Sequence, residues 1–206
     1  MGLKLTVLSW WTPSWIISKE LDHVSQVTTN ALISLLATYA PNNQIRTLNE
    51  KTKQSKTIST KRASMAAGHA ELVQKLVDSV GQNEAIKLGR DSLFEVGKNL
   101  GMETRDKLGV GDDPKNLIKA ARILYRVLGI DFRVDWSNET QAILIVDHCA
   151  LAQHYSELTC QVLSATDEGV VRGIAPNASM TFKELITSGC PKCKANIEFT
   201  MEKLTK

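Results

Sequence analysis

The sequence has no large excess of charge of one sign and no long apolar run. Its 206 residues carry 25 Lys and Arg against 22 Asp and Glu, a formal net charge of +3. Phosphate recognition usually shows as a clustered basic excess, so this balance argues against nucleic acid as a partner. The apolar stretch at residues 3–17 is interrupted by Pro13 and is too short to cross a bilayer. We therefore expect no transmembrane segment.

Cysteine is absent before position 149, and the four cysteines are Cys149, Cys160, Cys190 and Cys193. A chain of this length buries about 70% of its unfolded surface, so it needs neither disulfides nor a metal merely to fold. No small-residue cleavage site follows the apolar start, so we expect no secretory signal and a cytoplasmic location. Thiols stay reduced there, and their clustering suggests a metal or reactive site.

Aromatic residues are also scarce, at 5% of the chain, and unevenly placed. Three of the four tryptophans, Trp10, Trp11 and Trp15, precede the first periodic segment. They would pack against the body of the protein, or form a homodimer or partner-protein contact, or insert shallowly at a membrane surface, where tryptophan is favoured. Because only Lys4 and Lys19 add positive charge nearby, the sequence favours packing over a membrane.

Hydrophobic residues make up 43% of the chain, which is typical of a globular protein. In the first half they recur at spacings of three and four, which predicts helices. The expected helices cover residues 18–39, 60–80, 83–108 and 114–128. Residues 44–61 are polar and lysine-rich, a composition typical of a linker.

Two local signals refine these helices. Asp113 followed by Pro114 predicts a helix start, and Gly129 predicts its end. Gly89, Gly97 and Gly101 recur within the third helix, where each glycine costs about 1 kcal/mol relative to alanine. Such a series predicts close helix packing, or a ligand lying near the backbone.

After Gly129 the apolar residues alternate, which predicts paired strands. One expected hairpin joins residues 130–136 to 141–146, and a second joins 180–186 to 195–201. Residues 150–165 and 167–174 predict two separate helices between the hairpins. Helices grouped before paired strands indicate an α+β fold, with an antiparallel sheet built from two hairpins with helices between them.

Cys190 and Cys193 are three positions apart in a predicted turn, a spacing that presents two sulfurs to one metal ion. A zinc or iron–sulfur site needs two more ligands. The candidates are Cys149, Cys160, His148, His154 and Asp167. On one continuous helix, Cys149 and Cys160 would stand roughly 16 Å apart and would not share an ion. A four-cysteine site therefore requires Cys149 to lie at the end of the preceding strand.

A reactive thiol is the alternative to a metal. His154 and Cys160 are six positions apart, which places them on opposite faces of a helix and disfavours a Cys–His nucleophile–base pair. His148 beside a cysteine from another element stays open. A single buried cysteine is most often a small packing residue. His69, on the second helix, is interpreted as a partly buried histidine without a role.

The C-terminal part contains residues that follow a family pattern: Glu157, Cys160, Asp167, Gly173, Pro176, Phe182, Ile186, Gly189, Cys193 and Phe199. This pattern resembles the L-2-amino-thiazoline-4-carboxylic acid hydrolase family and the related vinyl-4-reductase domain. The likeness covers about residues 85–200 and is specific over 147–199. It implies an α+β domain whose sheet and helices enclose a small-molecule pocket.

The resemblance points to Cys160, Asp167 and Cys193 as the positions to carry over. In a hydrolase that opens a C–N or C–S bond of a small heterocycle, Cys160 would be the nucleophile or Asp167 the base, while His148 and His154 would contact the ligand. Cys190 departs from the usual polar residue in its turn, which favours a metal and weakens direct transfer of hydrolase activity.

Three functions follow as hypotheses: a small-molecule-binding domain with a cysteine-lined pocket and a candidate metal, the hydrolase, or a non-catalytic subunit that docks through its tryptophans. We divide the chain into residues 1–60, an N-terminal arm and helix with a polar linker, and residues 61–206, the α+β small-molecule-binding domain.

Overall fold

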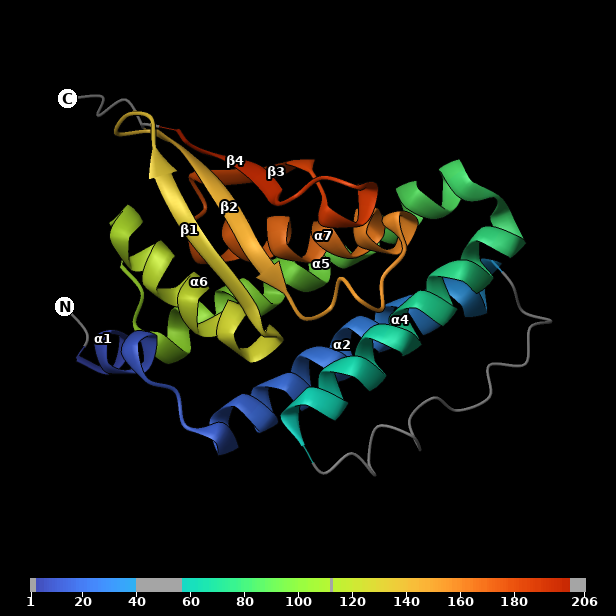
Figure 1. Ribbon diagram of the computed structural model, residues 1–206, viewed down its shortest axis with the longest axis horizontal. Coiled ribbons are helices and arrows are strands. Elements are labelled where there is room, and N and C mark those ends of the chain that lie inside the picture. Colours follow the sequence, from blue (N-terminus) through green and yellow to red (C-terminus); the bar gives the residue numbers. More distant parts are fainter. Residues whose placement is uncertain (1–2, 40–56, 112, 201–206) are drawn as a thin grey trace.

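The computed structural model describes residues 3–39, 57–111 and 113–200 (Figure 1). Most of the predicted polar linker, residues 44–61, lies outside the described residues. The helices are α1 (Leu3–Trp10), α2 (Ser14–Tyr39), α4 (Ile58–Val80), α5 (Gln82–Leu108), α6 (Pro114–Leu128) and α7 (Glu157–Ile174). The strands are β1 (Ile130–Trp136), β2 (Gln141–Cys149), β3 (Ala178–Glu184) and β4 (Cys193–Phe199).

The α+β prediction is confirmed. The four strands form one antiparallel sheet in the order β1-β2-β4-β3. Each predicted hairpin is present, and the pairing of β2 with β4 joins them. One face of the sheet carries small and apolar side chains, among them Leu144, Met180 and Ile197, which are buried against helices. In Figure 1, α6 and α7 lie against this face, and α2 and α4 run side by side beyond them.

The caps read from the sequence explain where α6 begins and ends. The Asp113 side chain accepts a hydrogen bond from the backbone N–H of Lys115 at 2.8 Å, and Pro114 is the first helical residue. Gly129 ends the helix with φ 74° and ψ 40°, a left-handed conformation that glycine adopts without strain. The boundaries predicted for this helix are therefore correct.

The prediction of two helices between the hairpins is wrong, because α7 is one continuous helix. Ser156 caps its start: its hydroxyl accepts a hydrogen bond from the N–H of Thr159 at 3.1 Å. Residues 151–154 form turns, so the helix begins later than expected. No glycine or proline interrupts residues 164–168, and Asp167 consequently lies within the helix rather than at a boundary.

The glycine series of α5 marks close packing against α7, as the spacing predicted. A Cβ atom on Gly97 would lie 2.0 Å from the carbonyl oxygen of Thr166, and one on Gly101 would lie 2.4 Å from that of Val170. The relation is reciprocal, because a Cβ on Gly169 of α7 would lie 2.1 Å from the carbonyl oxygen of Phe94. The two helix backbones touch, which fixes how α7 is rotated.

Helix α2 shares its core with the helices that follow it. Leu32 and Leu36 are buried in one cluster with Leu72 of α4, Leu93 of α5 and Val162 of α7. The structure therefore does not separate residues 14–39 from the rest of the chain, although the division into domains at residue 60 stays a prediction.

Candidate functional site

A cavity of about 90 Å³ lies between the sheet and the helices. It holds several water-sized volumes, since one water molecule needs roughly 15 Å³. Walls come from α2, α4, α6, α7, β2 and β4, so every layer of the fold contributes. We call it the inner cavity. Its polar and sulfur-bearing lining residues are Thr28, Met65, His69, Tyr125, Cys149, Tyr155, Cys160, Ser164, Thr166, Asp167 and Cys193.

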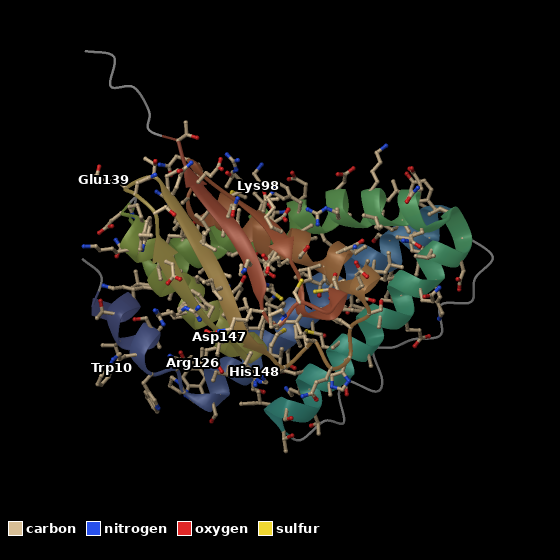
Figure 2. All side chains as sticks on the ribbon, turned by 45° about the horizontal axis from the view of Figure 1, so that its top comes forward. Trp10, Lys98, Arg126, Glu139, Asp147 and His148 are labelled. Carbon is tan, nitrogen blue, oxygen red and sulfur yellow. The ribbon has the colours of Figure 1, made fainter. Side chains whose placement is uncertain are left out.

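Three of the four cysteines, Cys149, Cys160 and Cys193, line the inner cavity. Cys149 ends β2, so it lies off the helix, the placement that a shared site demanded. Cys190 does not line the cavity. All four are free thiols, and sulfur atoms gather in the interior in Figure 2.

The cavity thiols are held in their neutral form. Burial raises the pKa of Cys160 to about 12, and the Thr187 hydroxyl opposes this only in part. Burial likewise raises the pKa values of Cys149 and Cys193. The Sγ atom of Cys193 accepts a hydrogen bond from the backbone N–H of Ile186 at 3.2 Å. Because the thiolate is the nucleophile and the metal ligand, this environment opposes both uses.

No group of three or more His, Cys, Asp or Glu residues in the described part of the chain is arranged to hold a metal ion. The residues proposed from the sequence therefore do not fit a zinc or iron–sulfur centre in this arrangement. Metal content stays a prediction, which elemental analysis and a visible absorption spectrum of anaerobically purified protein would test.

A hydrogen-bonded chain crosses one wall of the inner cavity. The hydroxyl of Thr28 donates to the carbonyl of Val24 at 2.7 Å and lies 2.9 Å from Nε2 of His69. Nδ1 of His69 lies 2.8 Å from the hydroxyl of Tyr155. Since the hydroxyl proton of Thr28 is donated to Val24, Nε2 of His69 donates to the Thr28 oxygen. The hydroxyl of Tyr155 then donates to Nδ1 of the same ring. Burial lowers the pKa of His69 to about 4, so the ring is neutral.

Asp167 is the unusual group of the site. Burial, with the neighbouring charge of Glu168, raises its pKa to about 7. Its carboxyl forms no hydrogen bond or ion pair with any residue that the structure describes, and its accessible surface borders the cavity. Glu168, the next residue, is satisfied: it accepts from Arg90 at 2.6 Å and from the N–H of Phe182 at 3.3 Å. Asp167 is thus left for a proton or a ligand.

A second cavity, of about 60 Å³, adjoins the first, and we call it the outer cavity. Tyr125, Thr166 and Asp167 line both. The hydroxyl of Thr166 is buried without a hydrogen-bond partner among the described residues. Burial and the charge of Asp167 raise the pKa of Tyr125 well above its usual value. The outer cavity continues to Glu20, His23, Glu103 and Lys107, which lie at the surface.

The two histidines proposed as ligand contacts are not brought to this site. His148 and His154 are exposed, and neither lines the inner or the outer cavity. Figure 2 shows His148 near Asp147 in the lower half of the view. The pairing of β1 with β2 shifts register between Asp131 and Phe132, so the alternation that buries Val146 does not continue to His148, which is exposed.

The sequence reasoning missed His69, Thr28 and both tyrosines. A signal for His69 was present, because it lies four positions after Met65 and three before Leu72, on the apolar face of its helix. A polar residue within such a stripe needs a partner. The partner itself, Tyr155, comes from a turn 86 positions away and had no local signal.

A comparison with models of protein families identifies the family of this chain. A model of the L-2-amino-thiazoline-4-carboxylic acid hydrolase family matches residues 59–197, and the chain belongs to this family. The match confirms the resemblance. The comparison with curated proteins gives no match.

Solved structures share the fold at low sequence identity. One is a trafficking protein particle complex subunit 3 from Naegleria fowleri covalently bound to palmitic acid, with a TM-score of 0.51 and 15% identity, covering 69% of this chain and 96% of that one. Another is the phenol-responsive sensory domain of the transcription activator PoxR with phenol, with a TM-score of 0.50 and 14% identity, covering 65% and 74%. These likenesses show a common fold.

Proposed function

We propose that the protein binds a small, mainly apolar molecule whose hydrogen-bond donor or weakly basic group is received by Asp167. The observation that carries the proposal is the unpartnered carboxyl of Asp167 beside the mainly apolar inner cavity. A buried carboxylate without a partner is costly, so a ligand that donates to it gains binding energy that water-exposed carboxylates do not offer.

The other lining groups define the class of ligand. Among the described residues, no Lys or Arg lines the inner cavity, so a ligand buried there brings no strong negative charge. Tyr155 is already committed as a donor to His69, and the thiols are neutral. A compact ring with one N–H or O–H group meets these conditions.

The comparisons support this class without identifying the molecule. The family is named after an acid with a 2-amino-thiazoline ring, whose ring and amino nitrogens are donors of the required kind. The sensory domain with the same fold holds phenol, a ring with one O–H. The carboxylate of the family's namesake finds no cationic side chain in the inner cavity, whereas Lys107 lines the outer one.

Calorimetric titration with 2-aminothiazoline and with phenol tests the proposal. Asp167→Asn should weaken 2-aminothiazoline binding by at least about tenfold, the value of one charge-assisted hydrogen bond. Cys160→Leu fills the inner cavity and should abolish binding, while Cys190→Leu, the same change outside the cavity, should leave it intact. Equal weakening by both leucine variants, or no binding of either probe, would contradict the proposal.

A second candidate, hydrolysis of a C–N or C–S bond, is favoured by one observation: a carboxyl with a pKa of about 7 is suited to act as a general base toward water. Cys160 is unsuited as nucleophile, because its thiol is protonated and no base contacts it. Incubation with 2-amino-thiazoline-4-carboxylic acid, with assays for released thiol and ammonia, tests this. Activity should survive Cys160→Ser, vanish in Asp167→Asn, and rise as pH passes about 7.

A further inference from the structure

Helix α1 is apolar on two opposite faces. Leu5 is 2% exposed and belongs to the main core, and Leu8 packs against the same core. Val7, Trp10 and Trp11, at spacings of three and four, share the opposite face. Trp10 is 91% exposed, and Trp11 and Trp15 are 66% and 68% exposed. Figure 2 shows Trp10 projecting from the edge of the molecule. The buried leucines account for one face only, so the tryptophans need another explanation.

The segment that carries these tryptophans is held firmly. Arg126 of α6 donates to the carbonyl oxygens of Leu8 at 3.2 Å and Ser9 at 3.0 Å, in the last turn of α1. It also donates to the hydroxyl of Thr12, which is buried. The tryptophans are therefore presented to the outside by a fixed helix rather than by a loose end.

Positive charge lies along α6, the helix that holds α1 in place. All four charged side chains of α6 are basic, although the whole chain is nearly balanced. Lys115, Lys119, Arg122 and Arg126 follow one another at spacings of four, three and four, so they share one face of α6. Nζ of Lys119 lies 3.4 Å from the hydroxyl of Thr6. In Figure 1, α1 lies alongside α6.

We propose that this surface, made of Val7, Trp10, Trp11, Trp15, Lys119 and Arg122, docks the protein onto an anionic phospholipid bilayer. Tryptophan rings are favoured at the headgroup level of a membrane. Basic side chains beside an apolar face are attracted to anionic lipids. No helix in the described part of the chain is long and apolar enough to span a membrane, so the contact is superficial.

A second copy of the chain fits the surface less well. A twofold interface places the same patch of both copies face to face. Lys119 and Arg122 of each copy would then approach those of the other without a compensating acid on α1 or α6. A bilayer of anionic lipid meets both the apolar and the basic part of the surface.

Vesicle binding tests the proposal on the full chain. With vesicles of phosphatidylcholine containing about one third phosphatidylserine, tryptophan emission should shift to the blue and the protein should co-sediment, and both effects should weaken as salt is raised. Lys119→Gln and Arg122→Gln should each weaken binding about fivefold. Trp10→Ser with Trp11→Ser should weaken it at least about tenfold. Trp10, Trp11 and Arg122 are exposed and Lys119 is half-buried, so the variants should keep the circular dichroism spectrum of the unaltered protein.

Two matched controls accompany these variants. Trp136→Phe changes the one tryptophan outside the surface, which stacks on Phe199 in the sheet. Lys183→Gln removes an exposed positive charge from β3. Both should leave vesicle binding unchanged. Equal binding to pure phosphatidylcholine vesicles, or no binding to either kind, would overturn the proposal. A concentration-dependent doubling of mass that Trp10→Ser abolishes, without vesicle binding, would also overturn it and assign the surface to a second copy.

Discussion

Replacing Gly97 by alanine tests the contact on which the position of α7 depends. A Cβ atom at this position would lie 2.0 Å from the carbonyl oxygen of Thr166, 2.8 Å from its carbonyl carbon and 2.9 Å from its Cα. Ordinary contact begins at about 3.4 Å, so the two helices would have to part by about 1.4 Å at this point. The obstacle is backbone, which has no rotamer to change, and Gly101 repeats the contact one turn later.

The magnitude follows from two opposing effects. Alanine is favoured over glycine inside a helix by about 1 kcal/mol. Overpacking of a close contact costs about 1–3 kcal/mol, and a backbone obstacle places this site at the upper end. The net loss in the free energy of unfolding should be about 2 kcal/mol. For a chain of this size that corresponds to a fall in Tm of roughly 4–8 °C.

Urea denaturation followed by circular dichroism measures the effect, and Gly68→Ala is the matched control. Gly68 lies within α4, and a Cβ atom there would meet nothing within 4 Å. That variant should gain up to about 1 kcal/mol, since only the helix preference remains. The same gain in Gly97→Ala would refute the close contact between α5 and α7. A loss of stability with unchanged ligand binding would refute the link between this contact and the cavity wall.

Three further outcomes are expected. Asp167→Asn should stabilise the protein at pH 8 by roughly 4 kcal/mol at most, and this gain should disappear near pH 4. The reason is the raised pKa of Asp167: between pH 3.8 and about 7 the folded state retains a proton that the unfolded state loses. Thermal melts across this pH range measure the effect, and a pH-independent difference in stability would contradict it. Tyr155→Phe should cost about 1–3 kcal/mol, since it leaves the buried Nδ1 of His69 without its donor; an equally stable variant would show that the tautomer assignment is wrong. In native protein at pH 8 a thiol reagent should modify Cys190 first, because Cys160 is protonated. Cys190→Ser should therefore remove the fast phase of the modification reaction. A fast phase that Cys160→Ser removes instead would restore Cys160 as a candidate nucleophile.

The fold was largely predictable from the sequence because its signals are local. Helix α6 is marked by Asp113, Pro114 and Gly129, all within one segment, and alternation marked both hairpins. The three glycines of α5 predicted a close helix contact without revealing the partner. That partner is α7, whose own Gly169 and Gly173 are spaced to match.

The site was less predictable because it joins residues that are far apart in the chain. The resemblance pointed to Cys160, Asp167 and Cys193, and all three line the inner cavity. His148 and His154 looked suitable by residue type, but a register shift at the end of β2 and a surface turn leave them exposed. His69 looked unremarkable because its partners, Thr28 and Tyr155, lie on other elements. Only the packing of α2, α4 and the turn before α7 brings them together.

The two successive acids of α7 explain why Asp167 stays unpaired. Residues one position apart on a helix point about 100° apart, so Glu168 and Asp167 face different neighbours. Glu168 is held by Arg90 of α5 and by the backbone of β3, and the glycine contacts hold α7 against α5 on either side of it. The helix therefore cannot rotate to carry Asp167 into solvent. The fold keeps the Asp167 carboxyl beside the cavity without a hydrogen-bond partner among the described residues. Either a bound proton or a ligand that donates to the carboxyl would remove this energetic cost. This is the physical basis for our proposal that a ligand is recognised at Asp167 rather than at the cysteines.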